Sequence, residues 1–293
     1  MTAEERRIRQ RPHLDPAGTV RLRGGGGPQT GGPQLAARRF HEAAADSATF
    51  VPAADAVILR QLATAPVRSV GRLLYASNAV FLLELDAPDP AGSGQPMRAV
   101  YKPARGERPL WDFPRHTLHL RERAAYLLSA ALGAEVVPPT ALRDGPHGPG
   151  SVQLYVHAAE GPPDGAATRD LERQLRGVAA FDVLANNADR KRAHLLLDRD
   201  GHLWGIDNAL TFLPYPRQRT VLIALGGGDL GPDEGERVRR LRDGAGRGAL
   251  RSSLRRLLSR VEVDAFEGRL DELAEHPWYP RLDDWDGRPF EWW

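Results

Sequence analysis

The chain has 293 residues, of which 41% are hydrophobic and 27% are charged, and its formal net charge at pH 7 is +2. This length and composition are typical of one or two globular domains. The absence of cysteine excludes a disulfide framework, a thiolate zinc site and a cysteine nucleophile. Residues 1–45 are rich in glycine and arginine and poor in large apolar residues, so we predict a disordered basic arm there.

The first globular pattern follows this arm and is rich in strands. Residues 54–64 carry apolar side chains at helical spacing and predict a short helix. Residues 67–85 predict two strands around a turn at residues 76–78, and residues 97–103 predict a third strand that ends in a proline.

A helix and two further strands complete this half. Residues 118–132 predict an amphipathic helix that ends at Gly133. Residues 136–144 and 150–158 each predict a strand. We therefore expect a strand-rich lobe at residues 46–160.

The remaining residues, 161–293, predict a mainly helical lobe. Residues 168–186 form a helical pattern, and residues 194–207 predict a hairpin between apolar strands. Helical patterns return at residues 236–244 and 249–276. The chain as a whole therefore predicts an α+β protein of two lobes.

Targeting signals are absent from the sequence pattern. No uncharged apolar run approaches the roughly 18 residues of a membrane span, and the N-terminus lacks the apolar stretch of a secretory signal. These features predict a soluble, cytoplasmic protein without a transmembrane segment. The basic arm could contact nucleic acid, but no aromatic residues are interleaved to stack on bases, which favours a solvated tail.

Only two of the 40 basic residues are lysines, Lys102 and Lys191. Lysine is a compact point charge that suits phosphate, whereas arginine is a wide planar fork. Lys102 ends the third predicted strand, and Glu122 lies 20 residues later in the next helix. A buried lysine that grips phosphates benefits from a carboxylate that fixes it. Ser77 and Asn78, at the preceding turn, could cover phosphates with backbone N–H groups, although no G-x-G-x-x-G motif is present.

The second half carries the complementary carboxylates. Phosphoryl transfer needs a carboxylate to orient the attacking hydroxyl, a cation for the phosphate oxygens, and oxygen ligands for magnesium. Asp189, Lys191 and Asp207 fit these three requirements in turn. The position five residues after Asp189, where protein kinases place a metal-binding asparagine, is His194. His194 is a poorer ligand for a hard cation, so a metal ligand, a neutral hydrogen-bonding residue and a packed histidine all remain open.

The order of these motifs resembles the phosphatidylinositol 3-/4-kinase-like branch of the protein-kinase fold. YKPARGERP is similar to the Lys-Pro strand of type II phosphatidylinositol 4-kinases, NADRKRAH to their Asn-x-Asp-Arg loop, and GIDNALTFLP to their Ile-Asp-Asn segment. YKPARGERPLWDFP, VPPTALRDGPHGPGSVQL and NNADRKRAHLLL together look like short actinobacterial proteins that are classed with these kinases. The resemblance covers about residues 65–215.

The resemblance implies a two-lobed protein-kinase-like fold that uses ATP with Mg²⁺ or Mn²⁺. Lys102 would contact the ATP phosphates and Glu122 would hold Lys102. Asp189 would be the catalytic base, Lys191 would neutralise the phosphate in transfer, and Asp207 would bind the metal.

The same resemblance assigns residues to the base of the nucleotide. Gln153 to Val156, including Tyr155, would join the two lobes and meet adenine through the backbone. His194 would stand in the place of the second metal ligand, which puts two-metal catalysis in doubt.

The sequence therefore predicts ATP-dependent phosphoryl transfer to a hydroxyl group of a small molecule or a protein. The short helical half, without a basic and aromatic membrane-facing segment, argues against a phosphoinositide acceptor. A non-catalytic nucleotide-binding pseudokinase and an AMP transferase on the same fold remain alternatives, as does a scaffold whose basic arm binds nucleic acid. In the simplest alternative, Asp189 and Arg190 form an ordinary surface ion pair without chemistry.

Overall fold

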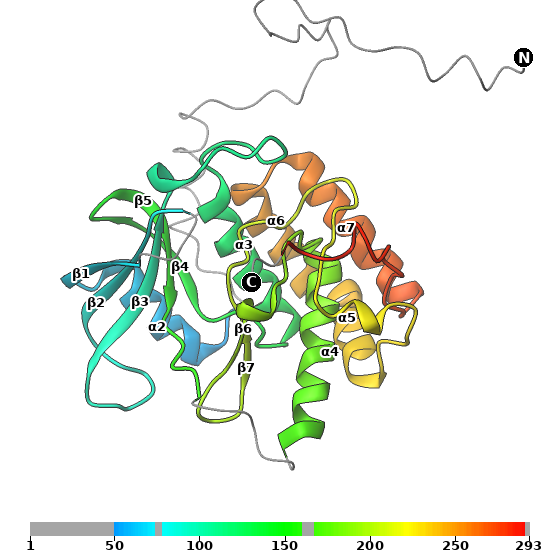
Figure 1. Ribbon diagram of the computed structural model, residues 1–293, viewed down its shortest axis with the longest axis horizontal. Coiled ribbons are helices and arrows are strands. Elements are labelled where there is room, and N and C mark those ends of the chain that lie inside the picture. The colour runs from blue at the N-terminus through cyan, green and yellow to red at the C-terminus, as the bar shows by residue number, and fades with distance from the viewer. Residues whose placement is uncertain (1–49, 74–77, 160–166, 291–293) are drawn as a thin grey trace, which may run out of the picture. The chain divides into compact units, whose positions relative to one another are not determined.

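A computed structural model describes residues 50–73, 78–159 and 167–290 of the chain. The arm predicted at residues 1–45 and the turn residue Ser77 lie outside these ranges. Within them, a strand-rich part precedes a mainly helical part, as the sequence pattern predicted (Figure 1).

The strand-rich part is built on one antiparallel sheet of five strands. Its spatial order is β1-β2-β3-β5-β4, so β3 lies at the centre of the sheet. Helix α2 (Ala53–Thr64), which the sequence predicted, packs on β2, β4 and β5. The strands are β1 (Val67–Leu73), β2 (Val80–Pro88), β3 (Pro96–Pro103), β4 (Thr140–Gly145) and β5 (Gly148–Leu154).

Alternation along β3 determines which of its side chains face the core. Met97, Ala99 and Tyr101 are fully buried in the apolar cluster that the sheet shares with α2. Because successive side chains of a strand point to opposite faces, Val100 and Lys102 point to the other side, where both line a cavity. The strand pattern alone therefore directs Lys102 away from the core.

The fourth and fifth strands differ from the predicted ranges. The strand expected at residues 136–144 begins only at Thr140, after Pro138 and Pro139. Proline has no N–H to donate to a sheet, so it is restricted to edges and strand ends. The fifth strand was expected to continue to residue 158, but it ends at Leu154. The chain therefore leaves the sheet earlier than its apolar pattern indicated.

Helix α3 (Leu118–Leu132) connects the two parts of the molecule and is almost completely buried. Thirteen of its 15 residues are buried, because it packs on β4 and β5 and also on α4, α5 and α6. It ends at Gly133, whose φ of 60° is the left-handed conformation that closes many helices. The other helices are α4 (Ala167–Ala185), α5 (Pro232–Asp243), α6 (Gly246–Leu257) and α7 (Arg260–Glu275).

The helical stretch expected at residues 249–276 is divided into α6 and α7. Ser259 caps α7: its hydroxyl oxygen accepts a bond from the Glu262 backbone N–H at 3.4 Å, and the Glu262 carboxylate accepts from the Ser259 N–H at 2.7 Å. This reciprocal capping box fixes the start of a helix. Glu262 also pairs with the buried Arg121, so the start of α7 is tied to α3 by one ion pair.

The hairpin predicted at residues 194–207 is present as β6 (Leu195–Leu197) and β7 (Leu203–Gly205). The connections within the described ranges contain three single turns of 3₁₀ helix: η1 (Ala104–Gly106), η2 (Arg192–His194) and η3 (Ile223–Leu225). Among the described residues, no helix is long and apolar enough to cross a membrane.

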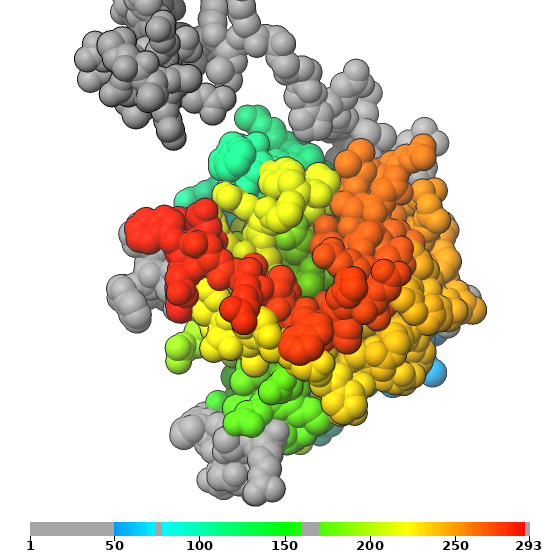
Figure 2. All heavy atoms as spheres, turned by 90° about the vertical axis from the view of Figure 1, so that its right-hand side faces the viewer, coloured from blue at the N-terminus to red at the C-terminus, as the bar shows by residue number. Residues whose placement is uncertain are grey.

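The segment that follows α7, residues 277–290, lies beside residues 220–230 and is coloured red in Figure 2. The Gly227 N–H donates to the Tyr279 carbonyl at 2.8 Å, and the Thr220 N–H donates to the Gly287 carbonyl at 2.8 Å. These bonds hold the C-terminal segment against the loop that follows the predicted metal-binding aspartate.

Candidate active site

A cavity of about 610 Å³ is lined both by the sheet and by the β6–β7 hairpin. Asp189 is absent from its wall but contacts Lys191, which is part of it. The other predicted site residues within the described ranges all line the cavity. They are Asn78, Lys102, Glu122, Gln153, Tyr155, Val156, Lys191, His194 and Asp207.

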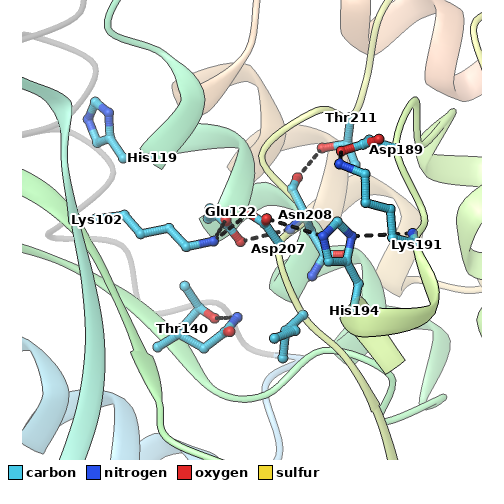
Figure 3. A network of polar contacts seen from close by, with 12 residues as sticks. Lys102, His119, Glu122, Thr140, Asp189, Lys191, His194, Asp207, Asn208 and Thr211 are labelled. Carbon is cyan, nitrogen blue, oxygen red and sulfur yellow. Dashed lines mark hydrogen bonds and ion pairs between the residues drawn. The ribbon is translucent and has the colours of Figure 1, made fainter. Parts of the chain in front are cut away.

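Three charged side chains from distant parts of the chain meet in the wall of this cavity (Figure 3). Lys102 at the end of β3 forms ion pairs with Glu122 of α3 and with Asp207 after β7. Lys102 Nζ lies 2.7 Å from Asp207 Oδ1. The Glu122 side chain is only 2% exposed, whereas that of Asp207 is 50% exposed. The lysine is thus held by a buried carboxylate while a second carboxylate remains open to the cavity.

The electrostatics of this triad keep Lys102 and Asp207 charged. The Lys102 ammonium group is the main reason that the pKa of Asp207 lies well below its usual range. Burial opposes the charge of Lys102, but the carboxylates of Asp207 and Glu122 outweigh it and raise the pKa of Lys102. A fixed positive charge beside an accessible carboxylate can bind phosphate and a cation together.

Arg190 lies in the segment between α4 and the β6–β7 hairpin, and its side chain is fully buried. It pairs with the fully buried Asp182 of α4, with Nη2 2.9 Å from Oδ1. Nη1 donates to the Ile206 carbonyl at 2.9 Å, and Nη2 donates to Asn208 Oδ1 at 2.7 Å. Arg190 therefore joins helix α4 to the residues on both sides of Asp207, and it does not form the surface pair with Asp189 that was one alternative.

Asp189 pairs instead with Lys191, at 2.8 Å between Oδ2 and Nζ. Their side chains are 22% and 30% exposed, so the pair is reachable from solvent. Burial raises the pKa of Asp189, and Lys191 partly offsets this effect. The Asp189 N–H donates to Asn187 Oδ1 at 3.0 Å, and the Asn187 amide donates to Asp182 at 2.9 Å. The same buried aspartate thus supports both Arg190 and the backbone at Asp189.

His194 lies between Lys191 and Asp207 in Figure 3. Its Nδ1 accepts a bond from the Lys191 backbone N–H at 3.4 Å, and its Nε2 is 3.4 Å from Asp207 Oδ2. Burial lowers the pKa of His194 to about 4. The ring therefore adjoins the carboxylate that was predicted to bind metal.

The cavity wall carries apolar side chains in addition to the residues that were predicted to meet adenine. Gln153 is buried inside β5, and its amide donates to the Thr140 hydroxyl at 2.9 Å. Tyr155 follows the strand and donates its N–H to the Arg98 carbonyl at 3.0 Å. The apolar side chains that line the cavity here come from the sheet, the hairpin and the segments next to them: Val80, Val100, Leu154, Val156, Leu196 and Ile206. Apolar side chains of this kind can pack against the faces of an aromatic base.

Asn78 is held by the segment that follows β3. Its side-chain oxygen accepts a bond from the Arg108 N–H at 2.9 Å, and the next residue, Ala79, donates its N–H to the Gly106 carbonyl at 3.2 Å. A Cβ at Gly106 would lie 2.4 Å from that of Ala79, so only glycine permits this approach. Ser77, the other predicted cover residue, lies outside the described residues.

The residues that sequence reasoning missed belong to the buried support of the site. Asp182 is 0% exposed within the apolar run VAAFDVLA of α4. A lone aspartate in such a run requires a buried partner, and this was the available signal. Asn208 accepts from Arg190, and its N–H donates to Glu122 at 3.2 Å. Its role depends on contacts between separate segments and could not be deduced from spacing.

The donor set is compatible with a divalent cation that is bound mainly through a nucleotide. Within residues 50–73, 78–159 and 167–290, no group of three or more His, Cys, Asp or Glu side chains could hold a metal by itself. Mg²⁺ is commonly held by one or two carboxylates together with substrate phosphates and water. Asp207, half-exposed in the cavity, is the carboxylate that could act in this way.

Comparisons with known proteins identify the type of fold. No family model matches the chain. The chain is 35% identical over 266 residues to Protein Rv2133c of Mycobacterium tuberculosis (strain ATCC 25618 / H37Rv), covering 79% of this chain and 93% of that protein. The structure of hydra Fam20 with sugar matches with a TM-score of 0.53 and 15% identity, over 74% of this chain and 87% of that one. The Golgi casein kinase with Mn/ADP bound matches with a TM-score of 0.49 and 15% identity, over 76% and 75%. The likeness to Fam20 confirms the predicted two-lobed, kinase-like α+β fold.

Proposed function

This chain belongs to the protein family of Mycobacterium tuberculosis Rv2133c, and from its kinase-like fold we propose that it is an ATP-dependent phosphotransferase. The observation that carries this proposal is the ion-pair triad in the cavity, in which Lys102 joins Glu122 and Asp207. Chain segments separated by 20 and 105 residues bring these groups together, which supports a selected site.

Each charged group of the site has a role in this proposal. Lys102 binds the ATP phosphates and Glu122 orients it. Asp207 holds a divalent ion, Mg²⁺ or Mn²⁺, which neutralises phosphate charge when bound. Asp189 accepts the proton of the acceptor hydroxyl group. The hydroxyl oxygen bonds to the γ-phosphorus while the bond from that phosphorus to the ADP oxygen breaks. Lys191 stabilises the charge on the phosphoryl group during transfer.

The remaining predicted residues contact the rest of the nucleotide. Gln153, Tyr155 and Val156 carry the segment that meets adenine, and its apolar surroundings support this assignment. Asn78 belongs to the cover over the phosphates. The Arg108 N–H holds the Asn78 side-chain oxygen in place, and we expect the cover to donate backbone N–H groups to the phosphates.

We further propose that the enzyme is of the phosphatidylinositol 3-/4-kinase-like type, on the order of its Lys-Pro, Asn-x-Asp-Arg and Ile-Asp-Asn motifs. The acceptor is a hydroxyl group of a small molecule or a protein. The contact between His194 and Asp207 favours one second candidate, a pseudokinase that binds nucleotide without catalysis.

Two substitutions test the proposal. Lys102→Met and Asp207→Asn should each reduce ATP turnover by at least about a hundredfold, because the first removes the cation that binds the ATP phosphates and the second removes the charge of the metal-binding carboxylate. Far-UV circular dichroism should stay unchanged. Asp200→Asn is the matched control, since this exposed hairpin carboxylate lies outside the proposed machinery and should leave turnover unchanged.

Mass spectrometry of the protein after incubation with ATP separates the alternatives. A phosphoryl adduct or product supports the kinase, and an adenylyl adduct supports AMP transfer. A protein that binds ATP but yields neither product nor turnover is a pseudokinase. Wild-type turnover in either cavity variant would mean that the site lies elsewhere.

A further inference from the structure

The two nitrogens of the His194 ring face partners of opposite kind. Nδ1 lies 3.4 Å from the backbone nitrogen of Lys191, whose N–H points to it as a donor. Nε2 lies 3.4 Å from Asp207 Oδ2. A backbone N–H only donates, whereas an ionised carboxylate only accepts.

These partners select one tautomer of the ring. A bare Nδ1 can accept from Lys191, and a proton on Nε2 can be donated to Asp207. The opposite tautomer would place two N–H groups face to face at Nδ1 and two acceptors face to face at Nε2. The side chain is only 11% exposed, so water cannot readily relieve such conflicts.

We propose that His194 is a positioning residue that donates its Nε2–H to Asp207, and that it is not a metal ligand. Coordination of a metal requires a nitrogen without a proton. The only bare nitrogen, Nδ1, is turned to the backbone of Lys191. The metal part of this inference rests on the proposed function, but the tautomer does not.

The consequence concerns how Asp207 is held. The backbone of Asp207 has a left-handed φ of 57°. Its two carboxylate oxygens contact different residues, Oδ1 contacting Lys102 and Oδ2 contacting His194. Two donors fix the direction in which the carboxylate faces the cavity. A divalent ion would then be retained by Asp207 and the nucleotide phosphates, so its affinity should depend on bound nucleotide.

Nitrogen-15 NMR of the full chain with labelled histidine tests the tautomer directly. The His194 signals are assigned as those lost in His194→Gln. We expect a protonated Nε2 and a bare Nδ1 at neutral pH, both in the free protein and after addition of Mg²⁺ and ADP. A proton on Nδ1, or a transfer of the proton from Nε2 to Nδ1 when Mg²⁺ and ADP are added, would overturn the proposal.

Metal affinity separates positioning from ligation. His194→Leu should change the dissociation constant of Mn²⁺ in the ADP complex by less than about threefold, measured by calorimetry, because no ligand is lost. It should reduce kcat by about tenfold to a hundredfold with little change in the KM for ATP, since one hydrogen bond to a charged group is lost. His194→Gln retains an N–H donor at a similar reach and should restore most of kcat.

The outcomes of this experiment are distinct from those of the proposed function. A loss of Mn²⁺ affinity of tenfold or more in His194→Leu contradicts the positioning role and makes His194 a ligand. If the wild-type protein binds neither ADP nor metal, the proposed function fails, and the tautomer found in the free protein still decides the hydrogen-bonding role.

Discussion

Residues 189–191, which follow α4, take part in two ion pairs, one of which is buried and the other partly exposed. Arg190 and Asp182 are both 0% exposed, whereas Asp189 and Lys191 are 22% and 30% exposed. Arg190 therefore turns to a buried partner, whereas Asp189 and Lys191 on either side of it pair with each other where solvent reaches them. One short loop thus supplies both a buried ion pair that supports the structure and a solvent-accessible ion pair at the proposed site.

The type of base in each pair fits its environment. Arginine presents several donors in a fixed plane, and Arg190 uses them for Asp182, Ile206 and Asn208 together. Lysine has a single mobile ammonium group, and that of Lys191 is paired with Asp189 alone among the described carboxylates. A buried network must be fully satisfied, but an accessible lysine can exchange its partner for a phosphate.

The largest effect should follow from breaking the buried pair. Arg190→Met leaves Asp182 as an uncompensated buried charge and should lower the free energy of unfolding by about 3–5 kcal/mol. Chemical denaturation at pH 7 measures this change. Lys191→Met is the matched control and should cost less than about 1 kcal/mol, because its pair is partly exposed. Equal costs for the two variants would remove the distinction between the pairs.

The next effect concerns chemistry without a loss of stability. Asp189→Asn should reduce ATP turnover by at least about a hundredfold, since general-base catalysis commonly contributes that much. Thermal denaturation of this variant should resemble that of the wild type. Retention of more than about half of the turnover would show that Asp189 is not the base.

The smallest effect is a displacement of the pH profile. Asp189 must be ionised to accept a proton, so turnover should fall as pH decreases through its pKa. Burial raises that pKa, and Lys191 lowers it. Lys191→Met removes the lowering effect, so the acidic limb of the profile of kcat/KM should move to higher pH. An unchanged or oppositely displaced limb would mean that another group controls the profile.

Much of the fold could be predicted because its signals are local. The alternating pattern of β3 directs Lys102 to the cavity, and Gly133 ends α3 where expected. The early end of β5 and the division at Ser259 were missed. Apolar patterns continue across both positions, and only the path of the chain and a capping side chain decide where the elements stop.

The site was predictable where spacing reflects chemistry and unpredictable where support comes from tertiary contacts. Lys102, Glu122 and Asp207 were assigned from their motifs and do meet in the structure, although their roles remain predictions. Asp182 and the true partner of Arg190 were missed, because the pair joins a helix to a loop through side chains that face inward. Sequence spacing does not report which way a loop side chain turns.

Calorimetric titration with ATP and Mg²⁺ tests the central claim, that the cavity around Lys102 and Asp207 binds a nucleotide. We predict one site per chain in the wild-type protein, and a loss of affinity of at least about tenfold in Lys102→Met. Asp200→Asn should bind like the wild type. Absence of binding to the wild-type protein, or equal affinity in Lys102→Met, would contradict the account.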